Sequence, residues 1–426
     1  MPLRRQALRL FAAIVAAVVL SQYFRASNGV IAPELMRDLA LSPESLGAVN
    51  GSFFVTLGLA QIPIGMAFDR YGPRRVIAAL TGLAVLGSLG FAAAQSAEAL
   101  LAARVVIGLG CAGSFMGAVV LASRWAPPDR FTQTLSWIFA LSNLGVLLAT
   151  TPLAAGTEAI GWRGTFVVAA AATAAVGVLF WLWVRDAPPG REIAAAEPEA
   201  PGAILRGVAA VWRTPGLVYV LAIHTVAYAT LLTVQGLWAG AYLHDVHGLD
   251  AVPRGNVLLA MAAATVLGVL GYGPLDRRFN TRKGVVGAGA LLTIAVLTAL
   301  TLLERPPVWL AAALLILLGL VGHYGVVIVA HGRSLFPDRL VGRGVTTVNL
   351  AQAAGCAVLP MLTGAVLGLF PCEAGGAPPE IAYRAVFGCL ALILLTGLLL
   401  YSRARDSKPL GERVSASGQG ASERGA

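Results

Sequence analysis

The stretch SQYFRASNGVIAPEL, residues 21–35, places a permanent cation, Arg25, inside a long apolar run. Gln22 and Asn28 lie three residues before and after it, a spacing that puts side chains on neighbouring positions of one helix face. In a membrane helix that ends near Ala32, Arg25 would lie about 10 Å from the helix end, close to the middle of the bilayer. A guanidinium flanked by amides is suited to binding a carboxylate or a phosphate through paired hydrogen bonds.

A second arginine, Arg104, lies inside another apolar run, and neither arginine has an acidic partner deep in a run. All 21 Asp and Glu fall in loops or within about one turn of the end of a run, the closest being Glu34, Glu98 and Glu158. Burying an ionisable group in hydrocarbon costs at least ~2.5–3.5 kcal/mol, so cations there are expected to have a function. Two uncompensated cations facing one cavity predict an anion site, because a bound anion supplies the missing charge.

The composition identifies the environment of these arginines. Of the 426 residues, 57% are hydrophobic and 12% are charged, whereas a soluble domain carries about 25% charged residues. Apolar runs of about 20 residues, long enough to cross a hydrocarbon core of about 30 Å as helices, recur along the chain. The sequence therefore predicts an all-α integral membrane protein with twelve spans: 8–32, 45–67, 76–96, 98–122, 132–156, 163–184, 215–242, 256–274, 284–303, 307–330, 343–369 and 383–402.

The net charge of +10 is explained by topology. If the N-terminus is cytoplasmic, most of the 31 Lys and Arg fall in inner loops and tails, and only a few, among them Arg37 and Arg254, fall in outer loops. This asymmetry follows the positive-inside rule and predicts a multi-pass protein of the cell membrane with both termini in the cytoplasm. Attraction to anionic membrane lipid accounts for the basic charge, and no nucleic-acid partner is expected.

A segment rich in Pro, Ala and charge, RDAPPGREIAAAEPEAPG, separates the first six spans from the last six. Two short sequences recur in the two halves. DRYGPRR after the second span is echoed by DRRFNTRK after the eighth, and WRGTF opening the sixth span is echoed by YRAVF opening the twelfth. Such repeats predict two pseudo-symmetric six-helix bundles with a cavity at the bilayer midplane. The predicted parts are an N-terminal bundle (1–184), a cytoplasmic linker (185–214), a C-terminal bundle (215–402) and a cytoplasmic tail (403–426).

The loop GMAFDRYGPRR, residues 65–75, resembles the signature loop between the second and third helices of the major facilitator superfamily. The resemblance extends to span number, linker position and repeats, while Pro73 departs from the basic residue common there. It implies a secondary transporter that is a monomer and works by alternating access. It also implies a gating role for the loop, in which Asp69 meets the start of the eleventh helix near Arg343; the alternative is that its arginines only fix topology. The residues assigned to gating are Asp69, Arg70, Gly72, Arg74, Arg75, Asp276 and Arg277.

The first span, YFRASNGVIAPEL, is similar to the first helix of the organophosphate/phosphate antiporters and related organic-anion symporters, in which an arginine contacts the substrate. The similarity assigns that contact to Arg25. The glycerol-3-phosphate type has a second arginine on helix seven, where this chain has Leu232, whereas some organic-anion symporters have one on helix four, as Arg104 is here. The sequence RVVIGLGCAG from Arg104 also resembles a motif of proton-coupled exporters, so ligand contact and a structural or relay role both remain open for Arg104.

Other polar residues within the spans are expected either to line the cavity or to pack between helices. His224 and His323 can carry a coupling proton, because imidazole changes charge near neutral pH; hydrogen-bonded packing is the alternative. Asn50 and Gln61 are further polar positions on the second helix. The remaining residues assigned to substrate binding are Asn143, Tyr228, Gln235, Trp238, Tyr324, Asn349 and Gln352.

The leading interpretation is a symporter or antiporter that moves a small organic anion, a carboxylate or a phosphorylated metabolite, with a proton or a counter-anion as coupling ion. The alternatives are a proton-coupled exporter of drugs or amphiphilic metabolites, which would need a buried carboxylate such as Glu34, and a transporter-like sensor. No nucleotide-binding loop or catalytic constellation is visible, so no enzyme activity and no cofactor are expected. His244, Asp245 and His247 have a spacing that a metal would tolerate, but solvated side chains are expected at this helix end.

Overall fold

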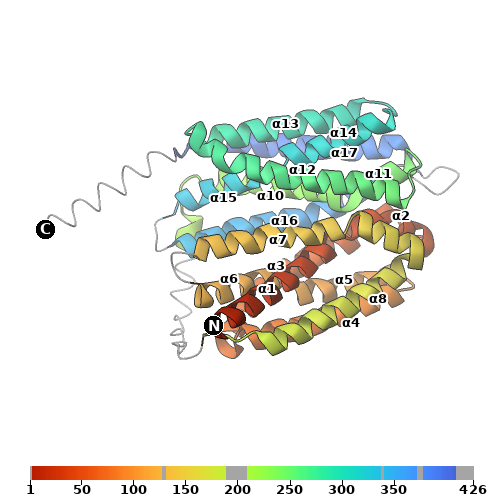
Figure 1. The fold of residues 1–426 in the computed structure, drawn as a ribbon. Coiled ribbons are helices and arrows are strands. Elements are labelled where there is room, and N and C mark those ends of the chain that lie inside the picture. The colour runs from red at the N-terminus through yellow and green to blue at the C-terminus, as the bar shows by residue number, and fades with distance from the viewer. Residues whose placement is uncertain (1, 127–130, 189–208, 337–339, 372–377, 409–426) are drawn as a thin grey trace. The chain divides into compact units, whose positions relative to one another are not determined.

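A computed structural model describes residues 2–126, 131–188, 209–336, 340–371 and 378–408, and every regular element within these ranges is a helix (Figure 1). The helices of the first half are α1 (Pro2–Ala26), α2 (Asn28–Leu39), α3 (Pro43–Tyr71), α4 (Pro73–Ala93), α5 (Ala97–Cys111), α6 (Ser114–Trp125), α7 (Phe131–Leu148) and α8 (Thr151–Trp183). Those of the second half are α10 (Leu217–Thr233), the π-helix η1 (Val234–Trp238), α11 (Ala239–Asp245), α12 (Ala251–Arg278), α13 (Arg282–Leu302), α14 (Val308–Val321), α15 (Gly325–Ser334), α16 (Val341–Gly368) and α17 (Glu380–Tyr401). The predicted all-α class is confirmed.

Eleven stretches of the described helices are long and apolar enough to cross a membrane, and one of them, Gln133–Trp183, runs for 51 residues. A continuous helix of that length would measure about 75 Å, more than twice the thickness of a hydrocarbon core. It is interrupted at Thr150 and again at Gly161, which has a φ of 71°. The stretch therefore supplies two crossings, which agrees with the predicted total of twelve.

The first, fourth, fifth, seventh and tenth predicted spans are not the continuous helices that the sequence indicated; the fifth, 132–156, breaks at Ala149 and Thr150, between α7 and α8. The first breaks at Ser27, between α1 and α2, and the fourth at Ala112 and Gly113, between α5 and α6. The seventh changes to a π-helix over Val234–Trp238, and the tenth breaks between Val321 and Gly325. Local breaks free backbone groups and re-aim side chains, and in transporters they occur where a cavity is lined.

The chain divides into two compact units. The first contains residues 1–198 together with 232–259 and 357–383, and the second contains 199–231, 260–356 and 384–426. Within the first unit, α4 packs against α5 and α8, α1 against α7, and α2 against η1 and α11 (Figure 1). Within the second unit, α13 packs against α14 and α15. The bundle boundaries at 184 and 214 stay a prediction.

The repeat WRGTF/YRAVF is matched by repeated contacts of its aromatic residues. Trp162 donates its Nε1 proton to Asp38, at the end of α2, over 2.9 Å, and Tyr383 donates its hydroxyl proton to Asp245, at the end of α11. The arginines that follow make a second matched pair of contacts. Arg163 donates to the carbonyl of Ala94 after α4, and Arg384 donates to the carbonyl of Thr301 in the last turn of α13. The two halves of the chain therefore share structure at positions where their sequences are alike.

The other repeat forms a matched carboxylate clamp at the start of a helix. Asp186 accepts a hydrogen bond from the backbone N–H of Arg74 at the start of α4, over 2.7 Å. Asp406 accepts from the backbone N–H of Lys283 at the start of α13, over 2.9 Å, and from Thr281 Oγ1 over 2.6 Å. A carboxylate at a helix N-terminus satisfies free N–H groups and interacts favourably with the helix dipole.

The environment of Asp406 shifts its pKa. Partial burial raises the pKa of this carboxyl, but the hydrogen bonds from Thr281 and from the backbone of Lys283 and Arg282 together lower it further, so the net shift is downward. In the first clamp, Gly72 allows the matching turn: its φ is 81°, and a Cβ there would collide with the Asp186 carboxylate.

We predict that Asp406→Ala lowers the free energy of unfolding by about 1 kcal/mol at pH 7, because the cap of α13 is lost. Thermal unfolding of the purified protein in detergent measures this. Since the folded-state pKa of Asp406 is lowered, its stabilisation persists as the pH falls to about 4 and is lost below that value. Glu304→Ala, at a carboxylate that is 79% exposed and lies outside the helices, is the control. Equal midpoints for the wild type and Asp406→Ala at pH 7 would contradict the clamp.

Candidate functional site

The break between α1 and α2 positions Arg25. It lies in the last turn of α1, followed by Ser27, whose hydroxyl donates to the carbonyl of Phe24 over 3.2 Å. Asn28 opens α2 directly afterwards. The guanidinium of Arg25 lies over the ring of Phe54 on α3, 5.7 Å from its centroid. The end of α1 favours a cation, and the aromatic face adds a second favourable contact.

Arg104 on α5 lies over the ring of Phe53, which is next to Phe54 on α3. Its guanidinium carbon is 4.9 Å from the centroid of Phe53 and 6.0 Å from that of Phe91. The adjacent residues Phe53 and Phe54 thus back one arginine each. Both arginines lie in the first unit, and their guanidinium groups contact adjacent rings of α3.

Neither arginine has a carboxylate partner among the described residues. Arg104 is fully buried, and its Nε, Nη1 and Nη2 atoms all lack a hydrogen-bond partner there; Arg25 is half-buried, and its Nε likewise lacks one. An aromatic face stabilises a cation by about 1–2 kcal/mol, much less than desolvating it costs. The arrangement leaves two guanidinium groups with donor protons available to an anion.

Three amides lie on elements that pack around the break between α1 and α2. Asn28 donates from Nδ2 to Asn50 Oδ1 on α3, over a long 3.4 Å. The π-helix η1 packs against α1 and α2, and Gly29 permits this approach, because a Cβ there would lie 2.7 Å from the Gln235 carbonyl oxygen. Buried atoms of all three amides lack partners among the described residues: Asn28 Oδ1, Asn50 Nδ2 and Gln235 Nε2. The site therefore offers free neutral donors and one acceptor in addition to the cations.

Other predicted binding residues of the first unit use their polar groups within the fold. Trp238 is fully buried and donates to Thr363 Oγ1 over 2.8 Å. Asn143 donates to the carbonyl of Phe139 in its own helix over 3.0 Å. Gln22 is half-buried and packs against α7 at Gly145. Their assignment to substrate binding stays a prediction.

The remaining predicted binding and proton-coupling residues lie in the second unit. His224 is 1% exposed, neither ring nitrogen has a hydrogen bond that meets normal geometry, and Gln352 is its polar neighbour. His323 lies in the break between α14 and α15, with its ring edge-on to Tyr228 at 5.6 Å between centroids. Tyr324 is fully buried beside Tyr272, whereas Asn349 is exposed.

Glu34 and Arg254 form an ion pair that the sequence did not indicate, in which Arg254 is buried and Glu34 is partly buried. Arg254 was assigned to an outer loop, but it lies in the first turn of α12 and is only 1% exposed. It pairs with Glu34 and donates from Nε and Nη2 to the carbonyl of Val30, over 3.1 and 2.9 Å. These bonds compensate its burial. The only signal in the sequence was Glu34 itself, one of the acids closest to a span.

The gating loop shows local contacts. Asp69, Arg70 and Arg75 are exposed, and the guanidinium of Arg70 lies over the ring of Tyr71. Arg74 donates from its side chain to the carbonyl of Trp181 and stacks on that ring at 4.4 Å. In the echo of this loop, Asp276 is buried 3.5 Å from Arg282, and Arg277 is exposed. The side chain of Arg343, the predicted neighbour of Asp69, lies outside the described residues.

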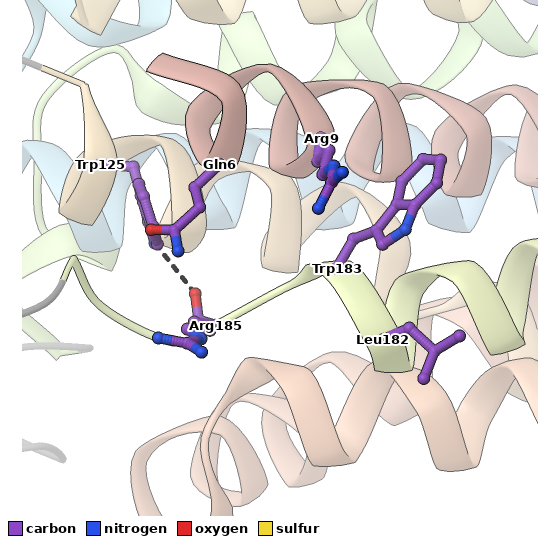
Figure 2. A pocket seen from close by; sticks show the side chains of 6 residues that line it. All are labelled: Gln6, Arg9, Trp125, Leu182, Trp183 and Arg185. Atoms are coloured by element: carbon purple, nitrogen blue, oxygen red, sulfur yellow. Dashed lines mark hydrogen bonds between the residues drawn. The ribbon is translucent and has the colours of Figure 1, made fainter. Parts of the chain in front are cut away.

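A pocket of about 100 Å³ lies where α1 begins and α6 and α8 end. It is lined by Gln6, Arg9, Trp125, Leu182, Trp183 and Arg185. Figure 2 shows Trp125 donating to the carbonyl of Arg185, over 2.9 Å. Arginine and tryptophan are enriched together at the surface of a membrane, so the lining is typical of helix ends at the membrane–water interface. None of the predicted binding residues lines this pocket.

Comparison with known proteins gives the context of the site. The family model of the Major Facilitator Superfamily matches residues 14–272. The chain is 26% identical over 298 residues to a probable sulfoacetate transporter of Cupriavidus necator, covering 64% of this chain and 68% of that one. It is 26% identical to a putative tartrate transporter of Agrobacterium vitis, covering 72% of this chain and 79% of that one. It is 27% identical to a probable nitrate/nitrite transporter of Mycobacterium tuberculosis, covering 91% of this chain and 93% of that one.

Solved structures share the fold. A bacterial homologue of the human lysosomal transporter Spinster, in an inward-facing and unoccupied conformation, superposes with a TM-score of 0.76 at 17% identity, covering 92% of this chain and 95% of that one. At this identity the likeness concerns the fold alone.

We predict that Arg254→Gln lowers the free energy of unfolding by about 3–5 kcal/mol, because it leaves Glu34 buried without its partner. The double variant Glu34→Gln/Arg254→Gln should lose less free energy of unfolding than the sum of the losses of the two single variants. A double-mutant cycle on thermal unfolding measures the coupling. The control is Glu304→Gln, in the Arg384–Glu304 pair whose acid is 79% exposed, with an expected loss below about 1 kcal/mol. Strict additivity of the Glu34 and Arg254 variants would rule out the pair.

Proposed function

The chain belongs to the Major Facilitator Superfamily, and on that premise we propose that it carries a small organic anion, a carboxylate or a phosphorylated metabolite, across the membrane by alternating access. It is a multi-pass membrane protein. In this proposal both termini are cytoplasmic, the protein acts as a monomer, and an ion or exchange gradient supplies the energy. The proposed binding site consists of Arg25 and Arg104 with the Phe53–Phe54 pair behind them and the amides beside them.

One observation carries the proposal: a fully buried arginine, Arg104, with all three guanidinium nitrogens unpaired among the described residues. Uncompensated burial of a cation destabilises a folded protein, so a residue of this kind is retained for what it binds. An anion with charge spread over two or three oxygens would accept from both guanidinium groups. Relatives named as transporters of sulfoacetate, tartrate and nitrate support an anionic cargo.

The exporter alternative draws its support from a more distant relative, a quinolone resistance transporter of Acinetobacter baumannii that is 24% identical over 191 residues. Such a function would call for a buried carboxylate able to exchange protons with cationic cargo. Glu34, the acid proposed for that role, is bound by Arg254. This pairing favours the anion proposal.

His224 and His323 are the proposed carriers of a coupling proton. Both lie within the spans, and each has a ring nitrogen without a partner among the described residues. A counter-anion exchanged at the arginine site is the other proposed source of energy. In that case neither histidine would be needed for transport.

We predict that Arg104→Met raises the ligand-free stability of the purified protein by at least about 1 kcal/mol, because it removes an uncompensated buried charge. The same variant should lose all thermal stabilisation by anions, which for the wild type is about 2.7 kcal/mol at a hundredfold excess over the Kd. The screen contains carboxylates, phosphorylated sugars, inorganic anions and lipophilic cations.

Arg254→Met is the matched control for this experiment, because Arg254 is as buried as Arg104 but is paired. It should lower the ligand-free stability instead of raising it. Anion-induced stabilisation that survives Arg104→Met, or stabilisation by cations alone, would overturn the assignment of Arg104 to an anion site.

A further inference from the structure

The amide pair Asn28–Asn50 is the polar feature of the site that a bare anion does not use. Both residues are buried, Asn28 fully and Asn50 to 1% exposure. They share one hydrogen bond of 3.4 Å, which leaves Asn28 Oδ1 and Asn50 Nδ2 without partners among the described residues. An anion satisfies only donors, so the acceptor on Asn28 needs a group of another kind.

The pair presents one free donor and one free acceptor whichever way its amides are turned. If both amides are flipped, the shared bond runs in the opposite direction and again leaves one N–H and one C=O. A hydroxyl group both donates and accepts. A single hydroxyl placed between the two free atoms would therefore complete both residues at once.

We propose that the Asn28–Asn50 pair binds a hydroxyl group of the transported anion, so that the cargo is a hydroxylated organic anion such as a hydroxycarboxylate. This inference rests on the proposed function, because it assumes that Arg25 binds the charged group of the same molecule.

Two short sequence intervals relate the two contacts. Arg25 lies over Phe54, and Asn28 bonds to Asn50. Asn50 and Phe54 are four residues apart on α3 and are neighbours on one face, with Cβ atoms about 5–6 Å apart, while Arg25 and Asn28 flank the break at Ser27. A cargo whose hydroxyl lies within a few bonds of its carboxylate suits two contacts arranged in this way.

The pair also gives the site a means of selection. A buried group that has lost water and gains no partner is penalised, so a cargo lacking the hydroxyl should bind about tenfold or more weakly. A trapped water molecule would complete the pair equally well and would remove this preference. The two possibilities differ in a measurable way.

The test uses four-carbon diacids with increasing numbers of hydroxyls: succinate, malate and tartrate. Their affinities for the purified protein are measured by titrating thermal stabilisation. The wild type should bind malate or tartrate at least about tenfold more tightly than succinate. Asn50→Leu should lose this preference, so that the ratio of the malate and succinate affinities falls to about one, whereas Gln133→Leu, at an exposed amide of α7, should keep the preference.

The wild-type ratio alone is decisive if Asn50→Leu does not fold. Glycolate against acetate and glycerate against propionate repeat the comparison for monoacids. Equal affinities of hydroxylated and hydroxyl-free members in all three series would overturn the hydroxyl proposal and leave the anion site standing. A wild type that responds to no anion in the screen would overturn the proposed function itself.

Discussion

The feature on which the account depends is a positive charge held in an apolar interior without a counter-charge. Arg104 is fully buried and unpaired among the described residues, and Arg25, which contacts the adjacent ring of α3, has one buried nitrogen unpaired there. The rings of Phe53 and Phe54 reduce the cost of this burial and leave the donor protons unused. An anion bound at these arginines would supply the missing negative charge.

The two buried arginines, Arg104 and Arg254, differ in their partners. Arg254 is as inaccessible as Arg104, yet it binds Glu34 and the carbonyl of Val30. The fold therefore supplies hydrogen-bond and charge partners to a buried arginine that has a structural role. The difference between the two residues separates a structural cation from one proposed to bind cargo.

The sequence was sufficient for the class of the fold, because hydropathy and the length of each span are properties of local composition. The repeats DRYGPRR/DRRFNTRK and WRGTF/YRAVF also located real contacts, at Arg74 and Lys283 and at Trp162 and Tyr383. These inferences needed only the types and order of residues.

What the sequence did not indicate depends on how helices meet. The breaks at Ser27, at Ala112 and after Val321, and the π-helix at Val234, lie inside predicted spans, and hydropathy summed over a whole span does not locate them. The ion pair between Glu34 and Arg254 joins residues 220 apart in the chain. The contacts of Phe53 and Phe54 with the arginines could not be predicted either, because adjacent aromatic residues in an apolar run are usually interpreted as packing residues. Tertiary contact decides each of these features.

The most direct test is transport by the purified protein in lipid vesicles, measured as entry of radiolabelled carboxylates, phosphorylated sugars and inorganic anions, with wild type and Arg25→Gln side by side. The account predicts that the wild type accelerates the entry of at least one anion, and that Arg25→Gln reduces this to the rate of empty vesicles. Neutral and cationic compounds should not enter with either protein. Anion entry that is unchanged in Arg25→Gln, or transport of lipophilic cations and of no anion, would contradict the account.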